Sequence, residues 1–596
     1  MSSPVPVRYV VGVSNLHSHY FDVSILLSKE ATARLGAASR GLTLRLPAWI
    51  PGSYMIRDFS KHLELFSAKS RNQEIQFIKT DSHTWQLAPF VGELQVSYRV
   101  YAFDTSVRSA YLDATRGFFN ATSLCLEIPE ADLPCELEII AKACPADWRV
   151  VTTLATQKVD ASGFGVYTAN SYDELIDHPV ALGNFQSVSW RAYGVPHQMV
   201  IQGAICEIDT KKLATDLKAI CESQITFFDP DKSKAPFHRY CFIVNAVGDG
   251  YGGLEHRDST VLLCKRDDLP YCGRDYSSDA AYQDFLGLCS HEYFHAWMVK
   301  RIKPKAFAPY DLSRPNHSTL LWLFEGFTSY YDDLHLFRSQ RIDLKAYLKR
   351  LEKTWNLVLR GVGRHKQSVA QSSFDAWTKY YQMDENTPNS VVSYYAKGSL
   401  IALALDLQLR HHTKKKVSLD HVMRHLWQMN SLSGQGIDES DIDGAVLFLA
   451  GSTFASKWQR FKADFIHGTQ DIPLAQLLTS EGFQVSVKPN TYLEDADVAK
   501  QVLGIRTVTV NGWVKVSHVM EDGWASSYGL ASGDYLSGIG GERVTPTRLD
   551  GLIRQLMRRL SVGEVVSIQV YRHERLLELQ AVQLLYLGPA QYQIGI

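Results

Sequence analysis

The sequence predicts a multidomain α+β protein, because the pattern of its residues changes repeatedly along 596 positions. A chain of this length exceeds what one hydrophobic core supports. Residues 1–190 hold short runs of β-branched and aromatic residues between turn residues, which is typical of β-strands. Helical periodicity takes over from about residue 200, and strand-like runs return from about residue 495.

Four domains follow from these changes. We expect a β-sandwich-like N-terminal domain over 1–190, a mixed segment over 191–345, a helical domain over 346–490 and a compact module over 495–596. The module is of ordinary domain size. The sequence contains neither tandem repeats nor a low-complexity linker.

Each domain has its own evidence in the residue pattern. "YFDVSILLS" predicts a strand of the first domain. In the mixed segment, "DTKKLATDLKAICESQITFF" predicts a helix and "RYCFIVNAVG" a buried strand. In the C-terminal module, "RTVTVNGWVKVSHV" predicts strands and "TRLDGLIRQLMRRL" an amphipathic helix.

Composition and charge exclude several classes of protein. Hydrophobic residues make up 45% and charged residues 21%, as in soluble globular proteins. Lys+Arg 62 against Asp+Glu 63 leaves a net charge of -1, so no basic bias favours nucleic acid or anionic lipid. The 9 cysteines are scattered, which predicts reduced thiols rather than disulfides. With neither a signal segment nor an apolar run that could span a bilayer, we expect a cytoplasmic protein.

The stretch "SHEYFHAWMVKRIKP" (290–304) holds the first sign of chemistry. We expect one helix from residue 276 until Pro304 stops it, which places His291 and His295 on one face, a turn apart. Two imidazoles at that spacing can bind one zinc ion, and Glu292 lies beside them, where it can act as a general base without being a ligand. The alternative is a helix whose histidines merely pack, because a match this short also arises by chance.

A catalytic zinc ion needs a third protein ligand. Glu325 is the best candidate, since it is a lone carboxylate in the apolar stretch "LLWLFEGFTSYYDDL" (320–334). A charge in such surroundings is costly unless it is paired or bound to metal. Two histidines and one glutamate on two helices form the gluzincin arrangement, so we expect one Zn²⁺ per chain. The alternative is an exposed glutamate on an amphipathic helix.

The stretch "GDGYGGLEHRDST" (248–260) follows the predicted buried strand and can form a sheet edge beside the helix. Gly252 and Gly253 allow a substrate to approach the backbone closely, and Glu255 offers a carboxylate there. A fixed carboxylate can bind the α-ammonium group of a substrate. A cleft with such a carboxylate would act as an aminopeptidase rather than as an endopeptidase. The alternative for this stretch, taken by itself, is a glycine-rich turn with a surface glutamate and no role in substrate binding.

Tyr394 and Tyr395 open the predicted helix "SYYAKGSLIALALDL" (393–407). A tyrosine hydroxyl near the metal can donate a hydrogen bond to the oxyanion of a tetrahedral intermediate. The residue pattern does not choose between the two, and aromatic packing at a helix start is the alternative.

Taken in order, six blocks resemble the PDZ-bearing glycyl aminopeptidases, the sixty-first metallopeptidase family, over nearly the whole chain. They are "LPAWIPGSYMIRDF", "YDELIDHPVALGNF", "YGGLEHR", "SHEYFHAWMVKRIKP", "LLWLFEGFTSYYDDL" and "YYAKGSL". The resemblance implies a thermolysin-like zinc peptidase domain over 191–345, behind the β-domain, with the helical domain 346–490 closing the active site.

The resemblance also implies roles for single residues. Zinc would be held by His291, His295 and Glu325. Glu292 would be the general base and then the proton donor, and Glu255 would hold the substrate amine. The larger aminopeptidase family places its catalytic tyrosine before x-Lys-Gly, which selects Tyr395.

Two departures from the larger family's pattern stand out. The interval between His295 and Glu325 is longer than usual, so the inserted "KPKAFAPYDLSRPNHST" (303–319) must form a loop. His256 stands where the larger family has asparagine, at the residue that would recognise the first peptide unit of the substrate.

The C-terminal module resembles a PDZ domain. "GLASGDYLSGIGGERV" (529–544) is similar to the pattern of that fold, and Leu503, Gly504 and Ile505 stand where its carboxylate-binding loop would be. Backbone N–H groups in such a loop can receive a peptide C-terminus. The resemblance therefore implies peptide or protein C-termini as partners of this module.

The predicted function is zinc-dependent hydrolysis of the N-terminal residue of peptides with a free N-terminus. The resemblance implies a small first residue, Gly or Ala. Two alternatives stay open at this point. One is an endopeptidase guided by the PDZ domain, and the other is a PDZ binding or scaffold protein with a non-catalytic metal site.

Overall fold

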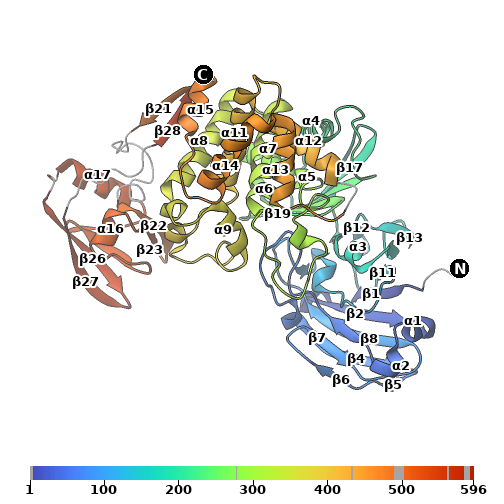
Figure 1. Ribbon diagram of the computed structural model, residues 1–596. Helices are drawn as coiled ribbons and strands as arrows, with labels where there is room; N and C mark the ends of the chain where they lie inside the picture. The colour runs from blue at the N-terminus through green and yellow to red at the C-terminus, as the bar shows by residue number, and fades with distance from the viewer. Residues whose placement is uncertain are drawn as a thin grey trace. The chain divides into compact units, whose positions relative to one another are not determined.

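The computed structural model describes residues 5–276, 278–430, 434–488, 503–559, 561, 563–582 and 591–595 (Figure 1). These residues form two compact units. The first holds the residues up to 316 with 331–342 and 423–438, and the second holds 317–330, 343–422 and the residues from 439 onward. None of the described helices is both long and apolar enough to span a lipid bilayer.

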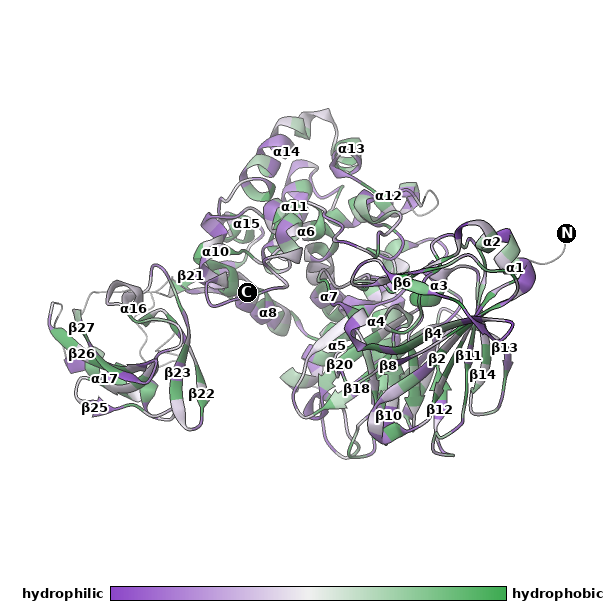
Figure 2. Ribbon diagram, turned by 90° about the horizontal axis from the view of Figure 1, so that it is seen from below, coloured by the Kyte–Doolittle hydropathy of each residue, from purple (hydrophilic) through white to green (hydrophobic). Residues whose placement is uncertain are grey.

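The N-terminal part of the first unit is rich in β-strands, as predicted. Within residues 5–276, its largest sheet has the order β13-β14-β11-β1-β2-β8-β4-β5. In that order the strands are Ala155–Val159, Gly165–Ala169, Cys135–Ile139, Val7–Val13, Tyr20–Leu27, Leu94–Tyr101, Leu63–Ser70 and Gln73–Glu74. Side chains of β1 and β2 are alternately buried and half-buried, and Figure 2 shows that strands of this sheet hold both hydrophobic and hydrophilic residues. This period of two places one face of the sheet on a hydrophobic core.

Smaller elements complete this β-rich part. One sheet has the order β12-β15-β10-β9, with strands Arg149–Val151, Val180–Gly183, Arg116–Phe119 and Ala110–Leu112. Another has the order β3-β7-β6, with strands Thr43–Arg45, Thr84–Leu87 and Phe77–Lys79. Three short helices accompany them within 5–276: α1 (Lys29–Arg34), α2 (Ala37–Arg40) and α3 (Tyr172–Ile176).

A mixed sheet follows, in the order β16-β17-β18-β20-β19. Its strands are Gln186–Ala192, Val195–Gln202, Tyr240–Val247, Ser259–Lys265 and Gly252–Glu255. Strands β17, β18 and β20 are parallel, which explains the continuous apolar run of the buried β18. Strand β19 is antiparallel to β20 and lies at the edge of the sheet, as expected for the glycine-rich stretch. The predicted helix between β17 and β18 is α4 (Thr210–Phe228).

Helix α5 (Ala280–Phe294) carries the histidine motif and contacts β19 and β20. The prediction that it continues to Pro304 is wrong, because the helix ends at His295. Val299 adopts a left-handed φ of 75°, and its N–H donates to the carbonyl of Ile302 at 2.7 Å. The apolar residues beyond His295 misled the periodicity argument, since a compact turn buries them as well as a helix would.

The segment that separates α5 from Glu325 forms a loop, as predicted. Among residues 303–319 the structure has a single short 3₁₀ turn, Lys305–Phe307. The loop is held by the first domain, since the Trp49 indole N–H donates to the carbonyl of Asp311 at 2.9 Å. The backbone N–H of Ala48 likewise donates to the carbonyl of Leu312 at 2.8 Å.

Helices dominate the second unit up to residue 480. They are α6 (Leu321–Phe324), α8 (Leu344–Arg360), α9 (Val369–Phe374), α10 (Thr387–Ser390), α11 (Ala396–His412), α13 (Glu439–Ala450), α14 (Ala455–Phe461) and α15 (Leu474–Ser480). Helices α7 (Gly326–Arg338) and α12 (Leu419–Asn430) have residues in both units. The start of α7 touches α11 backbone to backbone, because a Cβ on Gly326 would lie 2.6 Å from the Cα of Gly398.

The C-terminal module of the second unit is a sheet with helices α16 (Trp524–Ser527) and α17 (Leu549–Arg559). The sheet order is β22-β23-β24-β26-β27, with strands Ile505–Val510, Trp513–Val519, Tyr535–Ile539, Val565–Arg572 and Arg575–Val582, and β25 (Glu542–Arg543) pairs with β24. The predicted strands and amphipathic helix are therefore confirmed. Before and after the module, β21 (Gln484–Lys488) and β28 (Gln591–Gly595) pair with each other.

Candidate metal centre

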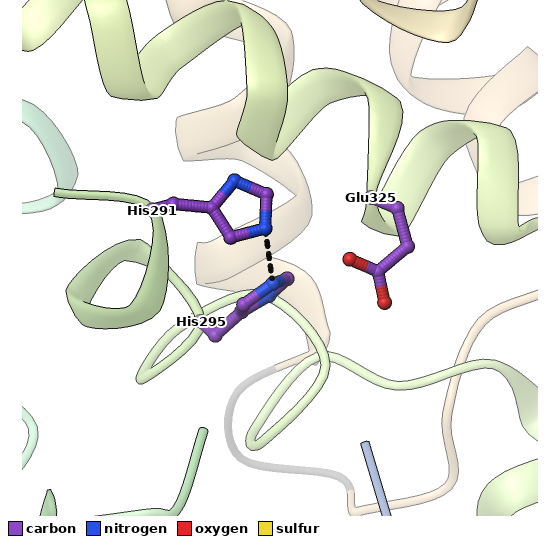
Figure 3. A group of neighbouring side chains, drawn as sticks. All are labelled: His291, His295 and Glu325. Atoms are coloured by element: carbon purple, nitrogen blue, oxygen red, sulfur yellow. Dashed lines mark hydrogen bonds between the residues drawn. The ribbon is translucent and has the colours of Figure 1, made fainter. Parts of the chain in front are cut away.

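Two histidines and a glutamate lie close enough together to share one metal ion. One ligand atom from each of His291, His295 and Glu325 lies within 4.8 Å of the others. Helix α5 carries His291 and ends at His295, and Glu325 stands between α6 and α7. Figure 3 shows the Glu325 carboxylate directed toward the two rings. The structure thus brings the three predicted ligands together.

Hydrogen bonds at Nδ1 of His291 and of His295 orient the two rings so that their Nε2 atoms face each other. Nδ1 of His291 lies 2.9 Å from Oδ2 of Asp332, and Nδ1 of His295 lies 3.2 Å from the carbonyl of Met298. Both partners accept protons, so each Nδ1 donates and each Nε2 of a neutral ring carries a lone pair. The two Nε2 atoms lie 3.1 Å apart (Figure 3). A cation that binds both lone pairs removes their repulsion.

The donor set fits zinc. Two imidazole nitrogens and one carboxylate oxygen are the three protein ligands of many catalytic zinc sites. Glu325 is 3% exposed and follows four buried apolar residues of α6. Burial of a carboxylate charge is costly, and a cation bound at this position would offset part of that cost.

Asp332 is a residue of the site that the sequence argument missed. It lies on α7 and accepts a hydrogen bond from Nδ1–H of His291, which fixes the tautomer and the orientation of that ring. A signal was present, because Asp332 follows Glu325 by two helical turns on the same helical stretch. Nothing in the sequence, however, places that face of α7 beside α5.

Glu292 is buried against strand β19. It is 5% exposed, and a Cβ built on Gly253 would lie 2.1 Å from its Oε1. Any side chain at position 253 would therefore displace the Glu292 carboxylate. The sequence predicts that Gly253 leaves room for a substrate. In the structure, the absence of a side chain at Gly253 leaves room for the Glu292 carboxylate.

Glu255 ends strand β19 and is also buried, with 4% exposure. Gly52, in the segment "WIPGSYM", lies directly against it, since a Cβ on Gly52 would come within 2.6 Å of both carboxylate oxygens. Gly52 has a φ of 93°, which a side chain would also strain. The first domain therefore contributes one wall around the predicted amine-binding carboxylate.

A buried group of charges lies behind Glu255. The Asp177 carboxylate is 2.6 Å from Nζ of Lys300, 2.7 Å from Nε of Arg257 and 3.3 Å from Nδ1 of His256. Burial alone would raise the pKa of Asp177, but Lys300 and Arg257 outweigh burial and hold this pKa well below its ordinary value. His256, which stands where the larger family has asparagine, belongs to this cluster. Its ring contacts the Asp177 carboxylate.

The two candidate tyrosines differ in their exposure. Tyr394 is 0% exposed, whereas Tyr395 is half-buried and precedes the first residue of α11, as predicted. The carbonyl of Tyr394 would lie 2.8 Å from a Cβ on Gly326, the residue after Glu325. The tyrosine segment is thus packed beside the predicted third ligand, and the Tyr395 hydroxyl is 3.3 Å from that of Tyr381.

The predicted carboxylate-binding loop of the C-terminal module lies within the described residues. The side chains of Leu503 and Ile505 are buried in the core of that module. Gly504 accepts a hydrogen bond from the N–H of Met520 at 2.7 Å. Binding of a peptide carboxylate at this loop stays a prediction.

Comparison with known proteins agrees with this site. The model of the peptidase M61 N-terminal domain matches residues 8–184, and that of the M61 glycyl aminopeptidase matches residues 284–401. An aminopeptidase N family protein from Idiomarina loihiensis has a structure with a TM-score of 0.90 and 37% sequence identity. The match covers 99% of this chain and 98% of that chain.

Structures of lower similarity are also matched. An M1 zinc metallopeptidase from Deinococcus radiodurans has a TM-score of 0.47 and 12% identity, over 79% of this chain and 95% of that one. Yeast LTA4 hydrolase has the same TM-score and identity, over 79% of this chain and 68% of that one. No curated protein matches the chain. Identity and coverage with the Idiomarina loihiensis protein, both family models and the histidine–glutamate site together show that this chain is a zinc aminopeptidase of the M61 glycyl aminopeptidase family.

Proposed function

We propose that the chain releases the N-terminal residue, Gly or Ala by preference, from peptides with a free N-terminus. The observation that carries this proposal is the position of Glu255 on the edge strand β19, two residues from Gly253, which touches Glu292. A buried carboxylate at that distance can hold the substrate ammonium group while the first peptide bond lies near the predicted base.

The residues have distinct proposed roles. His291, His295 and Glu325 would hold zinc, which when bound polarises the scissile carbonyl and makes water a better nucleophile. Glu292 would take a proton from the attacking water and then pass it to the leaving amine. The Tyr395 hydroxyl would donate a hydrogen bond to the oxyanion.

The preference for a small first residue rests on the wall formed by Gly52. Its Cα lies so near the Glu255 carboxylate that one methyl group would not fit between them. The side chain of the first substrate residue would lie beside this carboxylate and the segment "WIPGSYM" that holds Gly52. Glycine and alanine are the residues that need least room there.

We also propose that the domains are those of the sequence analysis: 1–190, a thermolysin-like catalytic domain over 191–345, a helical domain over 346–490 and a PDZ domain over 495–596. The edge strand β22 follows the Leu503–Gly504–Ile505 loop directly, an arrangement that suits addition of a peptide strand. Peptide or protein C-termini are the proposed partners there. Residues 489–502, which include the boundary, lie outside the described ranges.

Replacement of Glu255 by Ala tests the aminopeptidase proposal against the endopeptidase alternative. We expect E255A to lose about 100-fold in kcat/KM on alanyl peptides with a free amine, because a charged hydrogen bond to the ammonium group is lost. E222A, which removes a more exposed carboxylate of helix α4, is the matched control. Unchanged cleavage of free-amine peptides by E255A, or rapid cleavage of N-acetylated peptides by the wild type, would favour the endopeptidase.

A further inference from the structure

Arg108 stands beside the edge strand β19. Its Nη2 donates to the carbonyl of Gly253 at 3.2 Å, and its Nη1 lies 3.8 Å from the position of a Cβ on Gly252. Among the described residues no carboxylate lies within ion-pair distance of this guanidinium, and its buried Nε has no hydrogen-bond partner. Most of its five N–H donors are therefore unused by the protein.

The fold holds Arg108 firmly in this place. Its neighbours Val107 and Ser109 are buried, and the side-chain amide of Asn120 donates to both their carbonyls, at 3.0 and 3.2 Å. Asn120 is itself 0% exposed. The backbone N–H of Arg108 also donates to Oγ of Ser106 at 3.3 Å. The backbone that carries Arg108 is therefore anchored on both sides, and the hydrogen bond to the Gly253 carbonyl places the guanidinium at the strand edge.

The direction of a bound peptide follows from the two carboxylates, and this step rests on the proposed function. The substrate amine is held at Glu255, and the base Glu292 touches Gly253. The peptide must therefore run from Glu255 back toward Gly253, antiparallel to β19, with its first peptide bond between the Glu255 carboxylate and Gly253. Arg108 then lies next to the residue that follows the bond to be cut.

Distance along the strand defines which group would meet Arg108. An extended chain advances about 3.3 Å per residue, so Glu255 and Gly253 are about 7 Å apart along β19. An extended dipeptide has two residues, so its amine and its terminal carboxylate are also separated by about 7 Å. In a dipeptide the group at Gly253 is thus the terminal carboxylate, and guanidinium is the side chain best suited to bind it.

We propose that Arg108 binds the terminal carboxylate of short peptides, which makes dipeptides with a free C-terminus the preferred substrates of this aminopeptidase. The same guanidinium also donates to the Gly253 carbonyl, and a role confined to supporting that strand is the competing explanation.

The test compares kcat/KM for Ala-Ala, Ala-Ala-amide and alanyl p-nitroanilide in the zinc-loaded wild type and in R108Q and R108K. We expect the wild type to prefer Ala-Ala over its amide by about 10- to 100-fold, the usual range for a charged hydrogen bond. R108Q should remove this preference through a loss on Ala-Ala alone, and R108K should keep part of it. The control is R266Q, because Arg266 also donates to a glycine carbonyl, that of Gly203 at 2.8 Å, away from Glu255.

Two results would overturn the proposal. One is equal hydrolysis of Ala-Ala and its amide by the wild type, with alanyl p-nitroanilide also cut, which leaves the aminopeptidase function standing. The other is an equal fall on all three substrates in R108Q, which a supporting role for strand β19 predicts. If the wild type hydrolyses none of the three, the proposed function itself fails, and this inference fails with it.

Discussion

The carboxylate of Asp332 lies 2.9 Å from Nδ1 of His291 and is half-buried on helix α7. Because Nδ1–H donates a hydrogen bond to this carboxylate, the lone pair of the neutral ring is on Nε2, which faces His295 and Glu325. The negative charge of Asp332 also makes that imidazole a stronger ligand. Asp332 is thus a positioning residue for the metal site.

Replacing Asp332 with Asn should weaken zinc binding by about 10- to 100-fold, the usual effect of removing such a partner. Competition with a chromophoric chelator measures this directly. D333N changes the same charge at the next position and serves as the control. Equal zinc affinity in wild type and D332N would show that the ring is oriented by other contacts.

A methyl group at position 52 should disturb the predicted amine site. In G52A the new Cβ would lie within 2.6 Å of both Glu255 oxygens, so we expect KM for free-amine substrates to rise about tenfold or more while zinc content stays constant. G194A is a matched control, because Gly194 has a similar φ of 81° but open space around its Cβ. If both variants behave alike, backbone strain rather than the contact with Glu255 is responsible.

The two tyrosines before α11 should differ in their effect on catalysis. Y395F removes the half-buried hydroxyl, and we expect kcat to fall about 100- to 1,000-fold, the usual loss for an oxyanion donor. Y394F removes a fully buried hydroxyl and should affect kcat much less. Steady-state kinetics on an alanyl p-nitroanilide with thermal denaturation alongside distinguishes catalysis from folding. The reverse order of effects would assign the role to Tyr394.

Replacing Asp177 should destabilise the fold in a pH-dependent way. D177N leaves Lys300 and Arg257 without their shared buried carboxylate, which typically costs about 3–5 kcal/mol. The pKa of Asp177 is depressed in the folded state, so its contribution is full above the unfolded pKa of about 3.9 and is lost as the pH falls below it. Urea unfolding of zinc-free protein should therefore show a wild-type advantage at pH 7 that shrinks toward pH 3.

The exposed partner of the same arginine provides the control for this measurement. Asp173 also pairs with Arg257, at 2.9 Å, but its side chain is 57% exposed. D173N should cost less than about 1 kcal/mol, as surface pairs do. Equal losses in D173N and D177N would mean that burial of the cluster contributes little.

The three candidate metal ligands could be selected from the sequence because their signals are local. The spacing of His291 and His295 needs only one helical turn, and Glu325 is conspicuous as a charge among apolar residues. The end of α5 at His295 was not predictable, since the apolar residues beyond it satisfy a buried turn as well as a helix. Hydrophobic periodicity indicates which residues are buried, but it does not predict the left-handed backbone conformation of Val299 that turns the chain.

The supporting residues depend on contacts between distant parts of the chain. Asp332, Gly52 and Arg108 each act on a residue that sequence pattern does identify, but from another helix or from the first domain. Asp177 reaches its partners across about 80 and about 120 positions of the chain, which no local pattern reports. Such residues follow only from tertiary packing.

Zinc content measured beside hydrolysis of glycyl and alanyl p-nitroanilides, in wild type and in E292Q, tests the central claim most directly. We expect one zinc ion per chain in both proteins, because Glu292 is not among the three proposed ligands. We expect hydrolysis by the wild type and a kcat lower by about 100- to 10,000-fold in E292Q, the range for a lost general base. Stoichiometric zinc without hydrolysis by the wild type, or full activity in E292Q, would contradict the account.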